Sequence, residues 1–322
     1  MTSTTGHPET EVHGISFVVP AHNEQNGIAA TLERLKKVLT SVDLPYEILV
    51  VDDASTDETA RVVENIAYAT LIPHPSNGGY GLALKSGILN AKYGWIGIVD
   101  ADGSYEIEVI PELVRAMEDG FDMAIAERQN VAEHDTFLKG LSRRLYIAFI
   151  QVLVDRKVPD PNSGLRIFSK EMADGFLPFL CNSFSFTTSL TVFALGGAYF
   201  VKFVPSNYEA RIGESKVRHF RDSLRTIQLI VQGVTFYNPV KLFLLLALGH
   251  IVLVGLPGLV LSPFLPWLAL AYVIAASIPW VFLAIGALAD IFRISTLRHV
   301  NIAEYYGGKP VILHDMPSSK PR

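Results

Sequence analysis

The chain is poor in charged residues and nearly free of cysteine. Only 18% of its 322 residues are charged, 49% are hydrophobic, and the mean hydropathy is +0.30. The lone cysteine, Cys181, excludes an internal disulfide and is typical of a reducing compartment. A net charge of −5 argues against nucleic acid as a partner. The polar residues 1–13 do not resemble a secretory signal, and we expect them to form a flexible tail.

Charge is missing altogether from Leu242 to Ala289, a run of 48 residues without Asp, Glu, Lys or Arg. As a helix this run would measure about 72 Å, whereas one bilayer core takes ~30 Å. We therefore predict a two-helix transmembrane hairpin over residues 238–291, with spans near Pro239–Val260 and Trp267–Ile291. A buried hairpin of a soluble protein is the alternative, and the length of each apolar run disfavours it.

Basic residues flank the predicted spans on both sides, whereas the turn between the spans carries no charge. This distribution places both termini, including a tail over residues 292–322, in the cytoplasm. Residues 218–237 before the spans form a basic amphipathic pattern that predicts a helix in the lipid headgroup layer. Its apolar face would consist of Phe220, Leu224, Ile227, Val231 and Val234.

In residues 14–217, apolar strands alternate with amphipathic helices. The helix after the first strand, for example, has Ile28, Leu32, Leu35 and Leu39 on one face. This alternation predicts an α/β domain with a doubly wound, mostly parallel sheet. The predicted strands are Ile15–Val19, Glu47–Val51, Ala69–Ile72, Trp95–Val99 and Met123–Ala126.

Polar clusters follow three of these strands: Pro20–Glu24, Asp52-Asp53 and Asp100-Ala101-Asp102. Because ligands of such sheets bind beyond the carboxyl ends of the strands, we expect the clusters to share one rim. Two carboxylates at a strand end are suited to Mg²⁺, which takes oxygen ligands together with substrate phosphates. Alternatively, Asp102 only opens the turn to Ser104.

The loop Asn77-Gly78-Gly79-Tyr80-Gly81 invites a nucleotide-binding interpretation, but Leu84 stands where a dinucleotide fingerprint needs glycine and also breaks a Walker A motif. We interpret it as a loop of little bulk that leads into a helix and can approach a nucleotide. A turn that needs positive φ explains the glycines equally well.

Several basic residues are candidates for binding a phosphate: Arg128 and Arg143 in the first part of the chain, and Arg211 and Lys216, with Ser215, in a Gly/Ser turn before the amphipathic segment. The alternative is that these residues are only solvated surface charges. This alternative is less favoured for Arg211 and Lys216, because they lie in a Gly/Ser turn directly before a segment that is predicted to bind the membrane.

Taken in order, these motifs resemble family 2 glycosyltransferases of the GT-A fold. The residues that carry the resemblance are Pro20-Ala21-His22-Asn23-Glu24, Val50–Asp57, Asn77–Gly81 and Asp100-Ala101-Asp102. Ser163-Gly164-Leu165-Arg166, the stretch from Arg211 to Lys216 and the two spans are similar to the polyprenyl-phosphate branch, which includes dolichol-phosphate mannose synthase and GtrB-type enzymes.

The resemblance implies transfer of a hexose, with inversion, from a UDP- or GDP-sugar to a membrane polyprenyl phosphate, and we expect a homo-oligomer. It implies that Mg²⁺ or Mn²⁺ is bound by Asp102 and Asp100, with Ser104 where several relatives have a longer glutamine. Asp100, Asp102 and Arg128 would be catalytic. The donor would contact Pro20, His22, Glu24, Asp52, Gly79, Lys85, Asp100, Ala101 and Asp102.

An acceptor phosphate monoester is largely dianionic at neutral pH, because its second pKa is near 6, so it needs no general base. Its charge must instead be managed by cations, for which Arg128, Arg143, Arg211, Ser215 and Lys216 are the candidates. A processive polysaccharide synthase is the runner-up, although a Gln-x-x-Arg-Trp motif is missing. A nucleotidyltransferase and a non-catalytic membrane scaffold are further alternatives.

Overall fold

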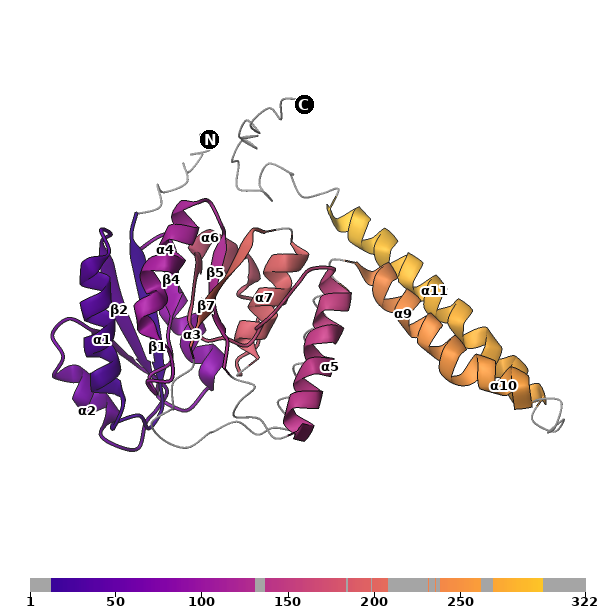
Figure 1. Ribbon diagram of the computed structural model, residues 1–322, viewed down its shortest axis with the longest axis horizontal. Coiled ribbons are helices and arrows are strands. Elements are labelled where there is room, and N and C mark those ends of the chain that lie inside the picture. Colours follow the sequence, from indigo (N-terminus) through magenta and orange to yellow (C-terminus); the bar gives the residue numbers. More distant parts are fainter. Residues whose placement is uncertain are drawn as a thin grey trace, which may run out of the picture. The chain divides into compact units, whose positions relative to one another are not determined.

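A computed structural model of the chain describes residues 13–130, 137–183, 185–197, 199–207, 238–261 and 269–297, together with positions 231 and 235 (Figure 1). The chain divides into two compact units, Met1–Val234 and Thr235–Arg322. The first contains a mixed sheet covered by helices, and the second contains long apolar helices.

The first unit is built on a seven-stranded sheet with the order β3-β2-β1-β4-β6-β5-β7. All neighbouring strands are parallel except β6, which runs antiparallel to β4 and β5. The prediction of a mostly parallel, doubly wound sheet is confirmed. The strands are β1 (Ile15–Ala21), β2 (Tyr46–Asp52), β3 (Thr70–Pro73), β4 (Trp95–Ile98), β5 (Met123–Arg128), β6 (Arg166–Ser169) and β7 (Val201–Ser206).

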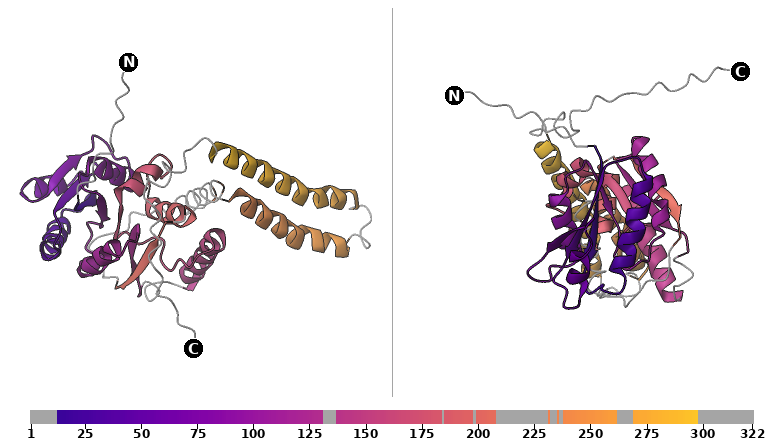
Figure 2. Two further views of the ribbon diagram at one scale, coloured as in Figure 1. Left: turned by 90° about the horizontal axis from the view of Figure 1, so that it is seen from above. Right: turned by 90° about the vertical axis from the view of Figure 1, so that its left-hand side faces the viewer.

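Helices cover both faces of this sheet (Figure 2). The central strand β1 is buried at all seven positions, which explains why it reads as a continuous apolar run. Its neighbour α1 buries the predicted face of Ile28, Leu32, Leu35 and Leu39. The helices are α1 (Ile28–Ser41), α2 (Thr59–Glu64), α3 (Tyr80–Asn90), η1 (Ile107–Val109), α4 (Ile110–Glu118), α5 (Phe137–Val154), α6 (Lys170–Phe176) and α7 (Phe186–Gly196).

The second unit contains α9 (Pro239–His250), a π-helical turn η3 (Ile251–Gly255), α10 (Leu256–Leu261) and α11 (Ala269–Leu297), with α9 packed along α11 (Figures 1 and 2). Two segments, Pro239–Leu261 and Ile274–Phe292, are long and apolar enough to cross a membrane, with mean hydropathies of 2.4 and 1.9. Only 6% and 11% of their most apolar windows are buried, unlike the core helix of a soluble protein. The first segment agrees with the predicted span Pro239–Val260 to within one residue, whereas the second begins seven residues later than the predicted Trp267–Ile291 and ends one residue after it.

The two long helices are joined by a hydrogen bond between a histidine and a backbone carbonyl. Pro279 lies inside α11 and has no N–H, so the Ala275 carbonyl one turn earlier loses its usual donor. The Nε2 atom of His250 lies 2.9 Å from this carbonyl oxygen and donates to it. The His250 ring also meets Phe282 edge-on, with ring centroids 6.5 Å apart. Because an unpaired carbonyl is costly in an apolar medium, His250 stabilises the kink-prone turn at Pro279.

The sequence predicted the five strands β1 to β5 with bounds that agree with the structure to within two residues. It did not predict the elements from α5 to β7. The expected amphipathic segment 218–237 lies, apart from positions 231 and 235, outside the described residues.

Candidate functional site

Three polar loops follow the carboxyl ends of the adjacent strands β2, β1 and β4. In register, Ala21 at the end of β1 stands beside Asp52 at the end of β2, and Val18 stands beside Ile98 near the end of β4. The loops from His22, from Asp53 and from Asp100 therefore meet at one edge of the sheet, as the sequence predicted.

The loops after β1 and β2 are joined by hydrogen bonds. The backbone N–H of Asn23 donates to the Ser55 hydroxyl (2.9 Å), and the N–H of Thr56 donates to the Asn23 side-chain oxygen (2.7 Å). His22 Nδ1 donates to the Asp53 carbonyl at 2.9 Å. Asn23 and Ala54 both have positive φ, 55° and 56°. Non-glycine residues held in this region cluster at functional sites, because the surrounding contacts must maintain a costly conformation.

Of the two acids after β2, Asp53 has the more extensive contacts. Its carboxylate accepts hydrogen bonds from the N–H groups of Gly78 and Gly79, both at 2.8 Å, and pairs with His74 Nδ1 at 2.8 Å. Burial alone raises the pKa of Asp53, but these donors together lower it below its ordinary value. Asp52 is also buried and accepts from the hydroxyl and N–H of Ser55. Asp53 thus fixes the glycine loop to the end of β2.

The glycine loop, residues Asn77–Gly81, packs closely against the backbone of Cys181 and Asn182. The Gly81 N–H donates to the Asn182 carbonyl at 3.1 Å, and a Cβ at Gly81 would lie 2.2 Å from the Cys181 carbonyl oxygen. Gly79 has φ +94°, and a Cβ there would lie 2.6 Å from the Asn182 oxygen. Both glycines are therefore required by close packing of protein backbone.

The two carboxylates after β4 have different partners. Asp100 Oδ1 accepts from the Tyr80 hydroxyl at 2.8 Å, and burial raises the pKa of this tyrosine well above its ordinary value. A Cβ at Gly164 would lie 2.8 Å from Asp100 Oδ2, so the loop before β6 passes directly over this acid. The buried Asp102 accepts at Oδ1 from the hydroxyl (2.6 Å) and N–H (3.0 Å) of Ser104.

The residues present suit a divalent cation that arrives together with a phosphate-bearing ligand. Asp100 and Asp102 supply the carboxylate oxygens that Mg²⁺ and Mn²⁺ prefer. Among the described residues, no group of three or more His, Cys, Asp or Glu side chains could hold a metal ion. Mg²⁺ sites of this kind use one or two carboxylates and take their other ligands from water and phosphate oxygens.

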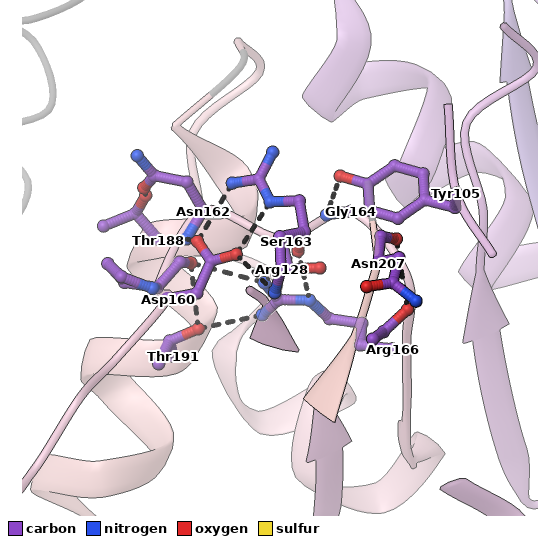
Figure 3. A network of polar contacts seen from close by, with 12 residues as sticks. Tyr105, Arg128, Asp160, Asn162, Ser163, Gly164, Arg166, Thr188, Thr191 and Asn207 are labelled. Carbon is purple, nitrogen blue, oxygen red and sulfur yellow. Dashed lines mark hydrogen bonds and ion pairs between the residues drawn. The ribbon is translucent and has the colours of Figure 1, made fainter. Parts of the chain in front are cut away.

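A largely buried ion pair lies at the carboxyl end of β5. Arg128 Nε lies 2.7 Å from Asp160 Oδ2, and a second guanidinium nitrogen lies 2.9 Å from Oδ1, a two-pronged contact (Figure 3). The two side chains are only 16% and 12% exposed. Burial on its own raises the pKa of Asp160, but Arg128 holds it below the ordinary value. Both groups are therefore charged at neutral pH.

A second arginine, Arg166, supports the loop over Asp100. It is fully buried at the start of β6 and donates to the carbonyls of Ser163 and Pro161, to the Thr187 carbonyl (2.9 Å) and to the Thr191 hydroxyl (2.9 Å) (Figure 3). Burial lowers the pKa of Arg166 to about 10, so the guanidinium remains protonated at neutral pH. Nearby, the Gly164 N–H donates to the Tyr105 hydroxyl at 2.6 Å.

Comparison with known proteins decides the family. Residues 16–176, half of the chain, match the family described as glycosyl transferase family 2. The chain belongs to this family. The matched region contains all three strand-end clusters and the Arg128–Asp160 pair.

Two relatives of this glycosyltransferase are named for their reactions. The undecaprenyl-phosphate 4-deoxy-4-formamido-L-arabinose transferase of Proteus mirabilis (strain HI4320) is 26% identical over 259 residues, 76% of this chain and 74% of the relative. The low-salt glycan biosynthesis hexosyltransferase Agl6 of Haloferax volcanii is 28% identical over 231 residues, 69% of this chain and 54% of the relative.

Solved structures support the fold. Glucosyl-3-phosphoglycerate synthase from Mycobacterium tuberculosis in complex with UDP has a TM-score of 0.56 at 18% identity, covering 69% of this chain and 80% of that one. The same enzyme with Mn²⁺, UDP-glucose and phosphoglyceric acid has a TM-score of 0.56 at 18% identity, covering 72% and 86%. The glycosyltransferase therefore has the predicted GT-A, Rossmann-like fold.

The structure shows the contacts of several predicted site residues of the glycosyltransferase. The hydroxyl of Ser104 donates to Asp102 Oδ1 at 2.6 Å, and the role of Ser104 as a metal ligand stays a prediction. Lys85 Nζ, predicted to contact the donor, donates to the Leu180 carbonyl at 2.6 Å, and burial lowers its pKa. Ala101 is buried, and its carbonyl accepts from Thr31 at 3.0 Å.

Of the remaining predicted residues, Pro20 and Glu24 lie at or just after the carboxyl end of β1. Pro20 lies within β1, and the N–H of the half-buried Glu24 donates to the Thr59 hydroxyl at 2.8 Å. Arg143 lies on α5 and is half-buried. Arg211, Ser215 and Lys216 lie outside the described residues.

Sequence reasoning missed Asp53 and Asp160. Asp53 could have been predicted from its position directly after Asp52. Successive side chains at the end of a strand point in different directions, so Asp53 can contact a different loop from Asp52. Asp160 had only the weak signal of an acid near the Ser163-to-Arg166 motif, because its partner Arg128 is 32 residues away.

Proposed function

We propose that this glycosyltransferase transfers a hexose, with inversion, from a UDP- or GDP-sugar to a polyprenyl phosphate in the membrane. The observation that carries the proposal is the union, in one chain, of a strand-end carboxylate site with two helices of membrane-spanning length. The undecaprenyl-phosphate transferase of Proteus mirabilis, which is similar over three quarters of this chain, supports the choice of acceptor.

Donor binding is assigned to the loops that follow β1, β2 and β4. The loops at His22 and Asp52 border the nucleotide, while Asp100 and Asp102 face its diphosphate. When bound by Asp102 and Asp100, Mg²⁺ or Mn²⁺ would neutralise the departing diphosphate. Ser104 holds Asp102 in one orientation through the 2.6 Å hydrogen bond, which reduces the cost of organising the site.

The transfer step needs no proton to be removed. An oxygen of the acceptor phosphate attacks the anomeric carbon, the bond from that carbon to the diphosphate breaks, and the nucleoside diphosphate leaves. Because a phosphate monoester is largely dianionic at neutral pH, no general base is required. The difficulty is the approach of two anions, which Arg128 near the donor site and Arg211 with Lys216 before the spans would relieve. Arg128 would do so while paired with Asp160.

The chain would act as an integral membrane protein with two spans, the glycosyltransferase unit and both termini in the cytoplasm, and as a homo-oligomer. The proposed orientation rests on the basic residues that flank the apolar segments.

The function is tested with full-length protein reconstituted in bilayers with polyprenyl phosphate and a panel of radiolabelled UDP- and GDP-hexoses. The expected product is a labelled lipid that releases its sugar in mild acid. Label in a polymer would indicate a processive synthase instead. Absence of label from lipid with every donor would contradict the proposal.

A further inference from the structure

Helix α5 carries a row of apolar side chains that face away from the protein. The row consists of Leu141, Leu145, Phe149 and Val152, which are 46%, 65%, 37% and 50% exposed. They are spaced by four, four and three residues, so they lie on one side of the helix. In the described part of the first unit, four of the seven exposed large apolar side chains belong to this row. Scattered exposed apolar residues are ordinary, but a continuous row marks an interaction surface.

The other side of α5 attaches the helix to its unit. Ile150, on the side opposite the row, is fully buried, and α5 packs against α7. Figure 1 shows α5 at the margin of the first unit. The apolar row is therefore an outward face of a docked helix.

The segment that carries the apolar row is strongly positive. Residues 137–157 contain five basic residues and one acid, so their net charge is 5 − 1 = +4, whereas the whole chain carries −5. Arg144, Arg156 and Lys157 are exposed. The basic residues are Lys139, Arg143, Arg144, Arg156 and Lys157, and the acid is Asp155.

We propose that this face of α5 binds the surface of an anionic lipid bilayer. A helix with an apolar side and basic flanks lies in the headgroup layer, its apolar residues reaching the acyl boundary and its cations meeting lipid phosphates. The proposal rests on the membrane location in the proposed function but not on the proposed reaction.

Charge argues against the two protein surfaces that could cover the row instead. In a two-fold contact between copies, residues 137–157 of one copy, with a charge of +4, would face the same positive segment of the other. Residues 208–237 of the same chain contain five basic and three acidic residues, 5 − 3 = +2, so they also repel α5. Anionic headgroups complement the charge of α5, and neither of these segments does.

The test places a fluorescent label on single cysteines in the full-length protein with Cys181→Ser, reconstituted in vesicles that contain doxyl-labelled lipids as quenchers. Leu145→Cys reports the row. Leu89→Cys on α3, with 69% exposure at Leu89, is the matched control outside α5. Val260→Cys in α10, with 66% exposure at Val260, is the reference inside a candidate span.

Quenching at position 145 should exceed that at position 89 and should rise when phosphatidylglycerol replaces phosphatidylcholine. Reversing Arg144, Arg156 and Lys157 to Glu should lower quenching at 145 at least about threefold and leave 260 unchanged. Equal quenching at 145 and 89, with strong quenching at 260, would overturn the docking and keep the membrane location. Weak quenching at all three positions would remove the membrane location and this inference with it.

Discussion

The two units of the chain satisfy their buried polar groups in different ways. The first unit buries charged groups and surrounds each with partners: Asp53 has two backbone N–H groups and His74, and Asp160 has Arg128. The second unit has no charged residue from Leu242 to Ala289, and its notable polar contact is from His250 to a backbone carbonyl. In the first unit, these charged groups lie at the carboxyl ends of β2 and β5, at the edge of the sheet where we propose that the donor binds. In the second unit, the contact from His250 joins α9 to α11.

The largest expected effect is the loss of transfer in Asp102→Ala. The change removes the carboxylate assigned to the metal and should reduce the rate by ~10³ or more, since losing one preorganised electrostatic contact at a transition state costs about 10²–10³. Turnover of radiolabelled sugar into lipid measures this. Asp119→Ala, which removes an exposed acid of the same unit, is the control and should keep full activity. Undiminished turnover of Asp102→Ala in excess chelator would contradict the role of this acid.

Next in size is the cost of breaking the buried ion pair. Arg128→Ala leaves Asp160 charged and buried, which should lower the free energy of unfolding of the first unit by about 3–5 kcal/mol. The control is Lys202→Ala, which breaks the exposed pair with Asp119 and should cost ~0–1 kcal/mol. Denaturant unfolding monitored by fluorescence compares the two variants. If the two variants lost the same free energy of unfolding, burial of the Arg128–Asp160 pair would not increase its contribution to stability.

The pH dependence of the same variants sharpens this prediction. In the wild type the pKa of Asp160 lies below its ordinary value of 3.8, so the stability that it contributes is present above that pH and is lost as the pH falls. Without Arg128, burial raises the pKa of Asp160 in the folded state, so acid should protonate it early and relieve part of the cost. The stability gap between the wild type and Arg128→Ala should therefore narrow as the pH falls toward 4.

In the hairpin, His250→Phe should cost about 0.6–1.7 kcal/mol, because it keeps an aromatic ring near Phe282 but removes the donor to the Ala275 carbonyl. Equilibrium unfolding in bicelles measures the cost. Pro279→Ala restores the backbone N–H that pairs with Ala275. In that background His250→Phe should cost less, and an equal cost in both backgrounds would show that His250 does not substitute for the missing N–H.

The smallest expected effect is that of Ser104→Ala. The variant loses the hydroxyl donor to Asp102 but keeps the backbone N–H that lies 3.0 Å from the same oxygen. Transfer should fall about tenfold or less, since one hydrogen bond of ~1 kcal/mol is involved. A loss as complete as that of Asp102→Ala would contradict this ranking and make Ser104 as important for metal binding as Asp102.

The sequence was most informative where pattern and position are local. The buried run of β1, the face of α1 and the acids at strand ends were predicted because alternation and helical spacing are visible in short windows. The antiparallel β6 was missed because its four residues carry no such pattern. The need for glycine at position 81 could not be predicted either, because the backbone that packs against it is at Cys181 and Asn182, about 100 residues later in the sequence.

The central claim is that Asp100 and Asp102 bind a divalent cation together with a nucleoside diphosphate. Titration of the full-length protein with Mn²⁺, followed by electron paramagnetic resonance with and without UDP or GDP, tests it directly. With one of the two nucleotides, Mn²⁺ affinity should rise about 5–150-fold, and Asp102→Asn should abolish the increase. Mn²⁺ binding that is indifferent to both nucleotides, or unchanged by Asp102→Asn, would contradict the account.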